Sequence, residues 1–109
     1  MTITLPAVVA AYFKAENIHD AAAVAQCFSI DGEVRDEQHI HRGRPAIVDW
    51  KRATSASYAA TVTPLASTTT PAGCAVKGEV SGNFAGSPVQ LNFDFTLDAG
   101  HITVLEITQ

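Results

Sequence analysis

The chain has 109 residues, a net charge of −4 and seven Lys and Arg residues scattered along it. This charge excludes a phosphate-binding face, so nucleic acid is not an expected partner. No apolar run approaches the roughly 18 residues that cross a bilayer, and the first residues do not resemble a secretion signal, so we expect a cytoplasmic protein that does not bind membranes. A chain of this length without a linker usually has one core, and we expect a single domain over residues 1–109.

Two helices are expected first. One spans about residues 5–17, with Thr4 as its cap and an apolar stripe at helical spacing. Asp20 is a good N-cap for a second helix that should run to about Phe28. The pair Asp31-Gly32 then indicates a turn.

A short strand over residues 33–38 should follow that turn. Alternation places Asp36 on the apolar side of the strand, together with Val34, Gln38 and Ile40. A carboxylate on that side finds a partner, has its pKa raised by desolvation or serves chemistry, and these outcomes can overlap. Asp36 is therefore the strongest functional candidate in the sequence.

The rest of the chain should form one helix and four strands. The helix begins near Arg44, and Trp50 and Tyr58 lie on one face of it. Residues 61–70 are β-prone, and Pro64 restricts this strand to an edge or a bulge. Clear strands follow over residues 74–84 and 89–97, with a last strand over residues 102–108. The inward positions of the strand over residues 89–97 are Val89, Leu91, Phe93, Phe95 and Leu97.

This order of elements predicts the fold class. Helices that are segregated from a run of strands indicate an α+β fold in which a curved antiparallel sheet wraps three N-terminal helices, in the order α-α-β-α-β-β-β-β.

Two cysteines and two closely spaced histidines raise the question of a metal. Cys27 and Cys74 fit neither a disulfide framework nor a paired zinc motif, and we interpret them as reduced core thiols. His39 and His41 would share one face of a strand about 6.6 Å apart, with Glu37 on the same side. No other His or Cys has the spacing to complete a ligand set, so we expect no metal and no cofactor. The histidines are then hydrogen-bonding residues of a bend, and His39 is a candidate ligand contact.

Short motifs in a characteristic order add a resemblance to this outline. They are Ala11-Tyr12-Phe13, Ile18-His19-Asp20, Val34-Arg35-Asp36, the run from His41 to Ile47, and Leu97-Asp98-Ala99-Gly100. With them, nearly the whole chain resembles the cone-shaped fold of the nuclear transport factor 2-like superfamily, in its SnoaL-like, ketosteroid isomerase-like branch. This fold hosts isomerases, cyclases, dehydratases, epoxide hydrolases and non-catalytic binding modules.

The resemblance also implies roles for two residues. Asp36 stands where the ketosteroid isomerases have their Asp base, and Tyr12 stands where they have their oxyanion-hole tyrosine. Their second pocket acid should fall near Phe93, but the nearest acid, Asp94, has outward parity, so the pocket is expected to lack it. Without the resemblance, Asp36 could be a structural carboxylate paired with a histidine or Arg35, and Tyr12 a packing aromatic.

The function expected from these residues is proton abstraction next to a carbonyl group in a small hydrophobic substrate. Asp36 would act as the general base and Tyr12 as the donor to the enolate oxygen. The expected ligand contacts are Val8, Val34, His39, Trp50, Tyr58, Leu91, Phe93 and Phe95. The alternatives are a non-catalytic ligand-binding or dimerisation module, and an epoxide hydrolase-like enzyme, for which no clustered Asp-Arg-Asp network is visible.

A homodimer through the outer face of the sheet is also expected. Strand parity gives this face few long charged side chains, Lys77 and Glu79 being the exceptions. Interface cores are depleted in charge, and most soluble oligomers have twofold symmetry. The alternative is an ordinary polar sheet surface. The other outward positions are Ser81, Asn83, Gln90, Asn92, Asp94 and Thr96.

Overall fold

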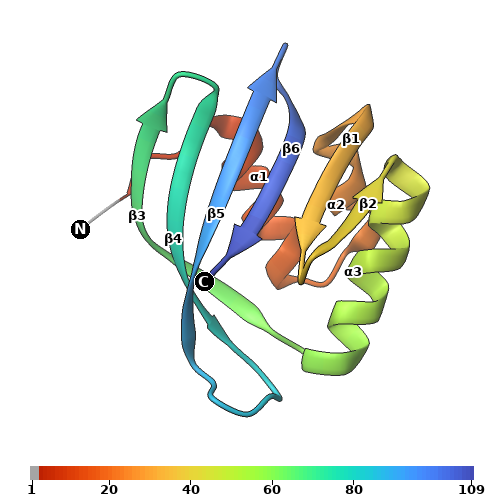
Figure 1. The fold of residues 1–109 in the computed structure, drawn as a ribbon, viewed down its shortest axis with the longest axis vertical. Coiled ribbons are helices and arrows are strands. Elements are labelled where there is room, and N and C mark those ends of the chain that lie inside the picture. The colour runs from red at the N-terminus through yellow and green to blue at the C-terminus, as the bar shows by residue number, and fades with distance from the viewer. Residues whose placement is uncertain (1–2) are drawn as a thin grey trace.

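The structure, a computed structural model, describes residues 3–109, which form three helices and six strands (Figure 1). In chain order these are α1 (Ala7–Asn17), α2 (Ala21–Gln26), β1 (Phe28–Asp36), β2 (His39–Arg42), α3 (Arg44–Tyr58), β3 (Thr61–Thr70), β4 (Gly73–Ser81), β5 (Val89–Asp98) and β6 (His101–Thr108). None of the helices within residues 3–109 is long and apolar enough to cross a membrane.

The six strands form one open sheet in the order β2-β1-β6-β5-β4-β3. Every neighbouring pair is antiparallel except β1 and β6, which are parallel. The expectation of a wholly antiparallel sheet is wrong at this one pair. A long stretch of chain that includes α3 separates these two strands, and no hairpin forces them to run in opposite directions. Pro64 lies on the edge strand β3 next to a bulge, as predicted.

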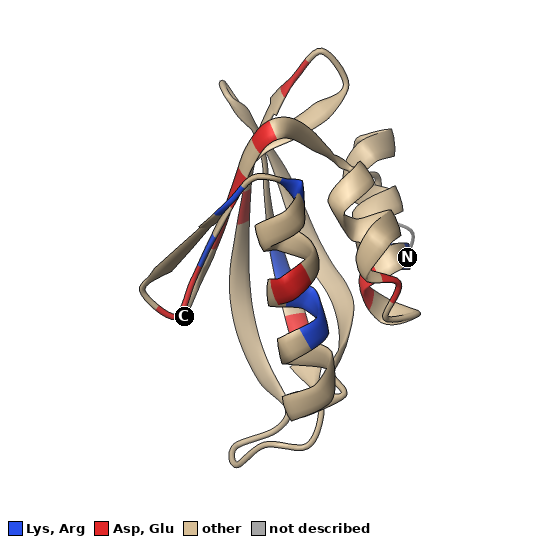
Figure 2. Cartoon of the chain, turned by 90° about the vertical axis from the view of Figure 1, so that its right-hand side faces the viewer, with Lys and Arg blue, Asp and Glu red and all other residues tan. Residues whose placement is uncertain are grey.

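The helices lie together against one side of the curved sheet, which confirms the predicted α+β class (Figure 1). Helix α3 packs against β1, β2 and α2, while α1 packs against α2, β3 and β6. Figure 2, viewed from the side of α3, shows acidic and basic residues interspersed along α3 and the strands near it.

The segment around β1 differs from its prediction. Helix α2 ends at Gln26, and Phe28 begins a nine-residue strand that includes the expected turn at Asp31-Gly32. The pairing of β1 with β6 is irregular between Phe28 and Glu33, and this irregularity accommodates the turn-forming pair within the strand. The pair Asp31-Gly32 therefore disturbs the strand pairing without ending the strand.

The chain turns after Asp36 instead. This turn changes which side chains lie on the same side of the sheet as Asp36. Glu37 and Gln38 both have positive φ values, 51° and 65°, as a tight two-residue hairpin turn requires. The chain then returns as β2, and Asp36 pairs with His39. Gln38 and Ile40 therefore do not share the inner side with Asp36, contrary to the prediction. Ile40 pairs with Arg35 on the outer side and is 63% exposed.

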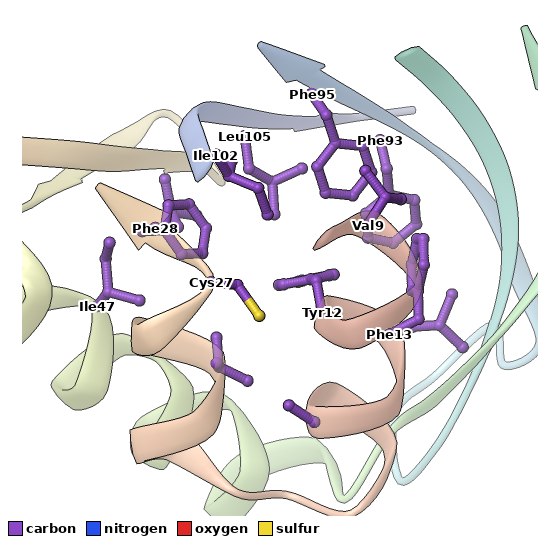
Figure 3. Close-up of a cluster of buried hydrophobic side chains, with 14 of the residues drawn as sticks. Val9, Tyr12, Phe13, Cys27, Phe28, Ile47, Phe93, Phe95, Ile102 and Leu105 are labelled. Carbon is purple, nitrogen blue, oxygen red and sulfur yellow. The ribbon is translucent and has the colours of Figure 1, made fainter. Parts of the chain in front are cut away.

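The core fills the space between the sheet and helices α1 and α2 (Figure 3). Tyr12 on α1 points inward towards Cys27 and Phe28, and its ring makes edge contacts with the rings of Phe13, Phe28 and Phe95. Each large apolar side chain buried here contributes roughly 1.5–3 kcal/mol. The packing occupies the inner face of the sheet beneath α1, and the space not filled by side chains lies towards α3.

Candidate active site

A cavity of about 920 Å³, open to solvent, lies between α3, the β1–β2 hairpin and the inner face of the sheet. One wall is apolar because inward-facing apolar residues of neighbouring strands lie opposite one another. Val80 is opposite Val89, and Phe93 is opposite Ile107. This wall consists of Val62, Val80, Phe84, Val89, Leu91 and Phe93. The volume lies within the range that accommodates a drug-sized molecule.

Asp36 lies on the opposite side of this cavity, at the end of β1. Its Oδ2 atom accepts a hydrogen bond of 3.1 Å from Nε1 of Trp50, the seventh residue of α3. Burial raises the pKa of the Asp36 carboxyl above its usual value, and the charge of Glu37 acts in the same direction. The hydrogen bond from Trp50 and the proximity of His41 offset part of this increase. A carboxylate with a raised pKa beside an apolar cavity is suited to accept a proton.

The hairpin turn places two histidines on the same side as Asp36. The ring of His41 lies 6.3 Å from the Trp50 ring and 6.5 Å from the His39 ring, measured between centroids. Both histidines line a smaller cavity of about 310 Å³, and Asp36 lines both this cavity and the large one. No group of three or more His, Cys, Asp or Glu residues that could hold a metal ion occurs within residues 3–109.

Tyr58 closes one rim of the cavity. Its hydroxyl group donates a hydrogen bond of 3.3 Å to Oε1 of Glu37, and its ring makes an edge contact with Phe84 at 5.9 Å. These contacts connect the end of α3 to the hairpin turn on one side and to the loop after β4 on the other. Tyr58 is therefore placed to limit access to Asp36.

Tyr12 does not lie on the cavity wall where the sequence reasoning placed it. Its side chain is fully buried, and its hydroxyl group donates to Oε2 of Glu16 at 3.2 Å. Burial, followed by the charge of Glu16, raises the pKa of Tyr12 well above its usual value; the charge of Asp36 contributes as well. Asp36 is therefore close enough to influence this phenol, but the two side chains do not meet.

Three other expected ligand contacts also lie outside the cavity wall, namely Val8, Val34 and Phe95. Val34 and Phe95 face the inner side of the sheet, as predicted. Helices α1 and α2 cover that end of the sheet, so both side chains lie in the core. Val8 is partly buried against the same core. The remaining expected contacts do line the cavity, and they are His39, Trp50, Tyr58, Leu91 and Phe93.

The structure adds two polar residues that the sequence reasoning missed, Glu16 and Lys51, and both line the cavity. Lys51 is 1% exposed, and its Nζ atom lies 3.1 Å from Oε1 of Glu16 and 3.3 Å from Nδ1 of His19. No local pattern joins these residues, because α1 and α3 meet only in the folded chain. The one available signal was that Lys51 directly follows Trp50 on a helix with a predicted inner face.

No second carboxylate lies where the ketosteroid isomerase pattern has one. Phe93 and Phe95 are buried on the inner face, whereas Asp94 between them is exposed on the outer face opposite Glu106, as its parity predicted. Arg35 is not paired with Asp36 either. It bonds to Oε2 of Glu33 at 2.6 Å, and Arg42 bonds to the other oxygen of the same carboxylate at 2.6 Å.

Comparison with known proteins agrees with this geometry. A candidate polyketide cyclase from Sinorhizobium meliloti is 38% identical to the chain, with a TM-score of 0.92 over 95% of each chain. A protein from Catenulispora acidiphila with a ketosteroid isomerase-like fold, solved with trimethylamine, is 21% identical over 97% of this chain and 87% of its own, with a TM-score of 0.86. An NTF2-like protein of unknown function from Cytophaga hutchinsonii is 13% identical over 98% of this chain and 90% of its own, with a TM-score of 0.78.

These structures share with the chain a curved sheet that packs against helices and leaves a cavity on its inner side. This arrangement defines their class of protein. The chain is accordingly a member of the nuclear transport factor 2-like superfamily, in its SnoaL-like branch. No protein-family model and no curated protein sequence matches the chain.

Proposed function

We propose that the protein is a cofactor-independent enzyme of the isomerase or cyclase type that acts on a small hydrophobic carbonyl compound. One observation carries this proposal: the Asp36 carboxylate, with a raised pKa, opens into a large cavity with an apolar wall. The similarity to the candidate polyketide cyclase, at 38% identity, supports the same reaction class. The trimethylamine in the Catenulispora acidiphila protein supports a small ligand.

In the proposed reaction, Asp36 removes a proton from the carbon next to the carbonyl group. The electron pair of the broken C–H bond moves to the carbonyl oxygen and produces an enolate. An isomerase then returns the proton from Asp36 to another carbon of the conjugated system. In a cyclase the enolate carbon attacks a second carbonyl carbon, the C=O electron pair moves to its oxygen, and this oxygen takes the proton from Asp36. Trp50 holds the carboxylate in position through its hydrogen bond, and the apolar wall places the substrate beside it.

Tyr12 has a positioning role in this proposal. Its phenol donates to Glu16, and it lies outside the cavity wall. We therefore assign to Tyr12 the support of Glu16 in place of the direct donation to the enolate that the family resemblance implies.

The proposal is tested with Asp36→Asn and a panel of cyclic ketones, enones and polyketide-like diketones. Loss of a general base should lower kcat/KM by about 10² to 10⁴. Asp49→Asn is the matched control, because Asp49 is an exposed carboxylate one residue before Trp50. An unchanged rate in Asp36→Asn would remove Asp36 from the mechanism.

The same panel separates the enzyme from a non-catalytic binding module of this fold. Binding of panel members to the wild-type protein without turnover of any of them would favour the binding module. An epoxide hydrolase-like reaction has less support, because Arg35 pairs with Glu33 and Asp94 faces away from the cavity.

We also propose that two copies pair through the outer face of the sheet. This face carries Gln90, Asn92, Asp94 and Thr96 on the central strand β5. Opposite Asp94 on β6 lies Glu106, and like charges directly across an antiparallel pair repel one another. Arg35, opposite Glu106 on β1, offsets part of this repulsion, and donor groups from a second copy, placed by twofold symmetry, would offset the rest.

A further inference from the structure

Lys51 is a buried charged group that the reaction outlined above does not use. Its side chain is 2% exposed, and that of its partner Glu16 is 12% exposed. Removing two charges from water is unfavourable unless their mutual attraction and further hydrogen bonds compensate. If this ion pair only held α1 against α3, it could lie away from the cavity. Both residues line the large cavity.

The contacts of Lys51 do not use all of its hydrogen-bond donors. An ammonium group has three N–H donors and no acceptor. One N–H donates to Nδ1 of His19 at 3.3 Å, and the ammonium group forms an ion pair with Oε1 of Glu16 at 3.1 Å. Among residues 3–109, no third partner of the Lys51 ammonium is present in the structure. An N–H of this ammonium is therefore left for a molecule in the cavity that Lys51 lines.

Lys51 and Asp36 line the same cavity. Lys51 follows Trp50, the residue that holds Asp36, and Thr54 one turn later lines the same cavity. A substrate in this cavity that has its acidic carbon at Asp36 can direct its carbonyl oxygen towards Lys51.

We infer that Lys51, oriented by Glu16 and His19, is the hydrogen-bond donor that receives the carbonyl or enolate oxygen of the ligand. It supplies the charge stabilisation that the missing second carboxyl group supplies in the ketosteroid isomerase pattern. The ammonium keeps its proton throughout, and the proton removed from carbon moves only to Asp36. The inference rests on the proposed function in taking the ligand for a carbonyl compound that forms an enolate.

Binding of an enolate mimic tests this inference without turnover. The probe is 4-nitrophenol, at a pH at which it is ionised, with 4-nitroanisole as the neutral isostere that lacks the oxyanion. Isothermal titration calorimetry gives Kd for each. Lys51→Met should weaken 4-nitrophenol binding about tenfold or more, since a hydrogen bond from a charged donor is lost, and should leave 4-nitroanisole binding unchanged.

Removing Lys51 alone leaves Glu16 as an unpaired buried carboxylate, which can unfold the chain. The double variant Glu16→Gln with Lys51→Met avoids this charge, and its far-ultraviolet circular dichroism verifies the fold. It should show the same loss of 4-nitrophenol affinity. Glu16→Gln by itself keeps the ammonium group and removes a repelling charge, so it should bind 4-nitrophenol as tightly as the wild type or more tightly. Lys77→Met, which alters an exposed lysine on the outer face, should change nothing.

Two results would overturn the inference. One is equal affinity of the folded double variant and the wild type for 4-nitrophenol. The other is wild-type binding of 4-nitrophenol that is no tighter than that of 4-nitroanisole. Asp36→Asn separates this inference from the proposed function: it should retain 4-nitrophenol binding while losing turnover. If no panel compound is turned over but 4-nitrophenol binding still depends on Lys51, only the proposed reaction fails.

Discussion

Nε1 of Trp50 donates a 3.1 Å hydrogen bond to Oδ2 of Asp36 and so ties the middle of α3 to the last residue of β1. The hydrogen bond lowers the pKa of the Asp36 carboxyl group because it stabilises the ionised form, whereas desolvation raises this pKa. Burial is the larger of the two effects, and the pKa of Asp36 is raised. The pair therefore sets both the position of the carboxylate and the pH at which it becomes a base.

Substitution of Trp50 by phenylalanine should move the activity profile to higher pH. The change removes a bond that favours the ionised carboxylate, and the pKa of Asp36 should rise further. The acidic limb of kcat/KM against pH should shift upward by about one unit, which corresponds to the loss of one hydrogen bond to a charged group. Tyr58→Phe, at the cavity rim, serves as the control and should leave this limb in place. A profile that is the same for Trp50→Phe and the wild type would contradict the role of the bond.

Asp36→Asn should stabilise the protein near neutral pH and not in acid. The folded-state pKa of Asp36 is raised, so its contribution to stability is fully present below the unfolded pKa of about 4 and is lost as pH rises through the folded pKa. The asparagine side chain of the variant does not ionise, so the variant does not lose this stability as pH rises. Urea unfolding should therefore give the variant a larger free energy of unfolding at about pH 7 and little difference at about pH 3. A variant that is less stable than the wild type at neutral pH, with equal m-values, would contradict the burial of the charge.

Tyr12→Phe should affect stability more than rate. The phenol is fully buried and donates to Glu16, so its removal should cost about 1 kcal/mol, the usual net contribution of one hydrogen bond. Because Tyr12 does not line the cavity, kcat should change less than about tenfold, whereas loss of a direct oxyanion donor costs about 10² to 10³. Thermal unfolding and steady-state kinetics on one active substrate measure the two effects. A kcat loss in the larger range would restore Tyr12 as the direct donor.

The outer face of the sheet should hold two copies together. Light scattering at high protein concentration should give a mass near twice 11.5 kDa. Asn92→Arg places a long charge at the centre of this face and should lower the mass towards that of one chain. Arg52→Ala, on the exposed side of α3, is the control and should leave the mass unchanged. A wild-type mass near 11.5 kDa would rule out the dimer.

The sequence by itself determined the features that depend on local periodicity. The start of α3 at Arg44, the edge strand with Pro64 and the inward set of β5 follow from turn chemistry and from alternation over a few residues. The outward direction of Asp94, and with it the lack of a second acid near Phe93, follows from the same alternation. Such a pattern persists in β5 because this strand buries one face, with Phe93 and Phe95 in the core.

Only the tertiary structure decided how these elements meet. The two-residue turn after Asp36 reversed the parity of β2 and placed His39 and His41 on the same side as Asp36. The packing of α1 on the sheet placed Tyr12 in the core, and the contact between α1 and α3 joined Glu16 to Lys51. These arrangements depend on which distant segments pack together and bury their apolar side chains away from water. Alternation within one segment does not specify which segment packs against it across the core.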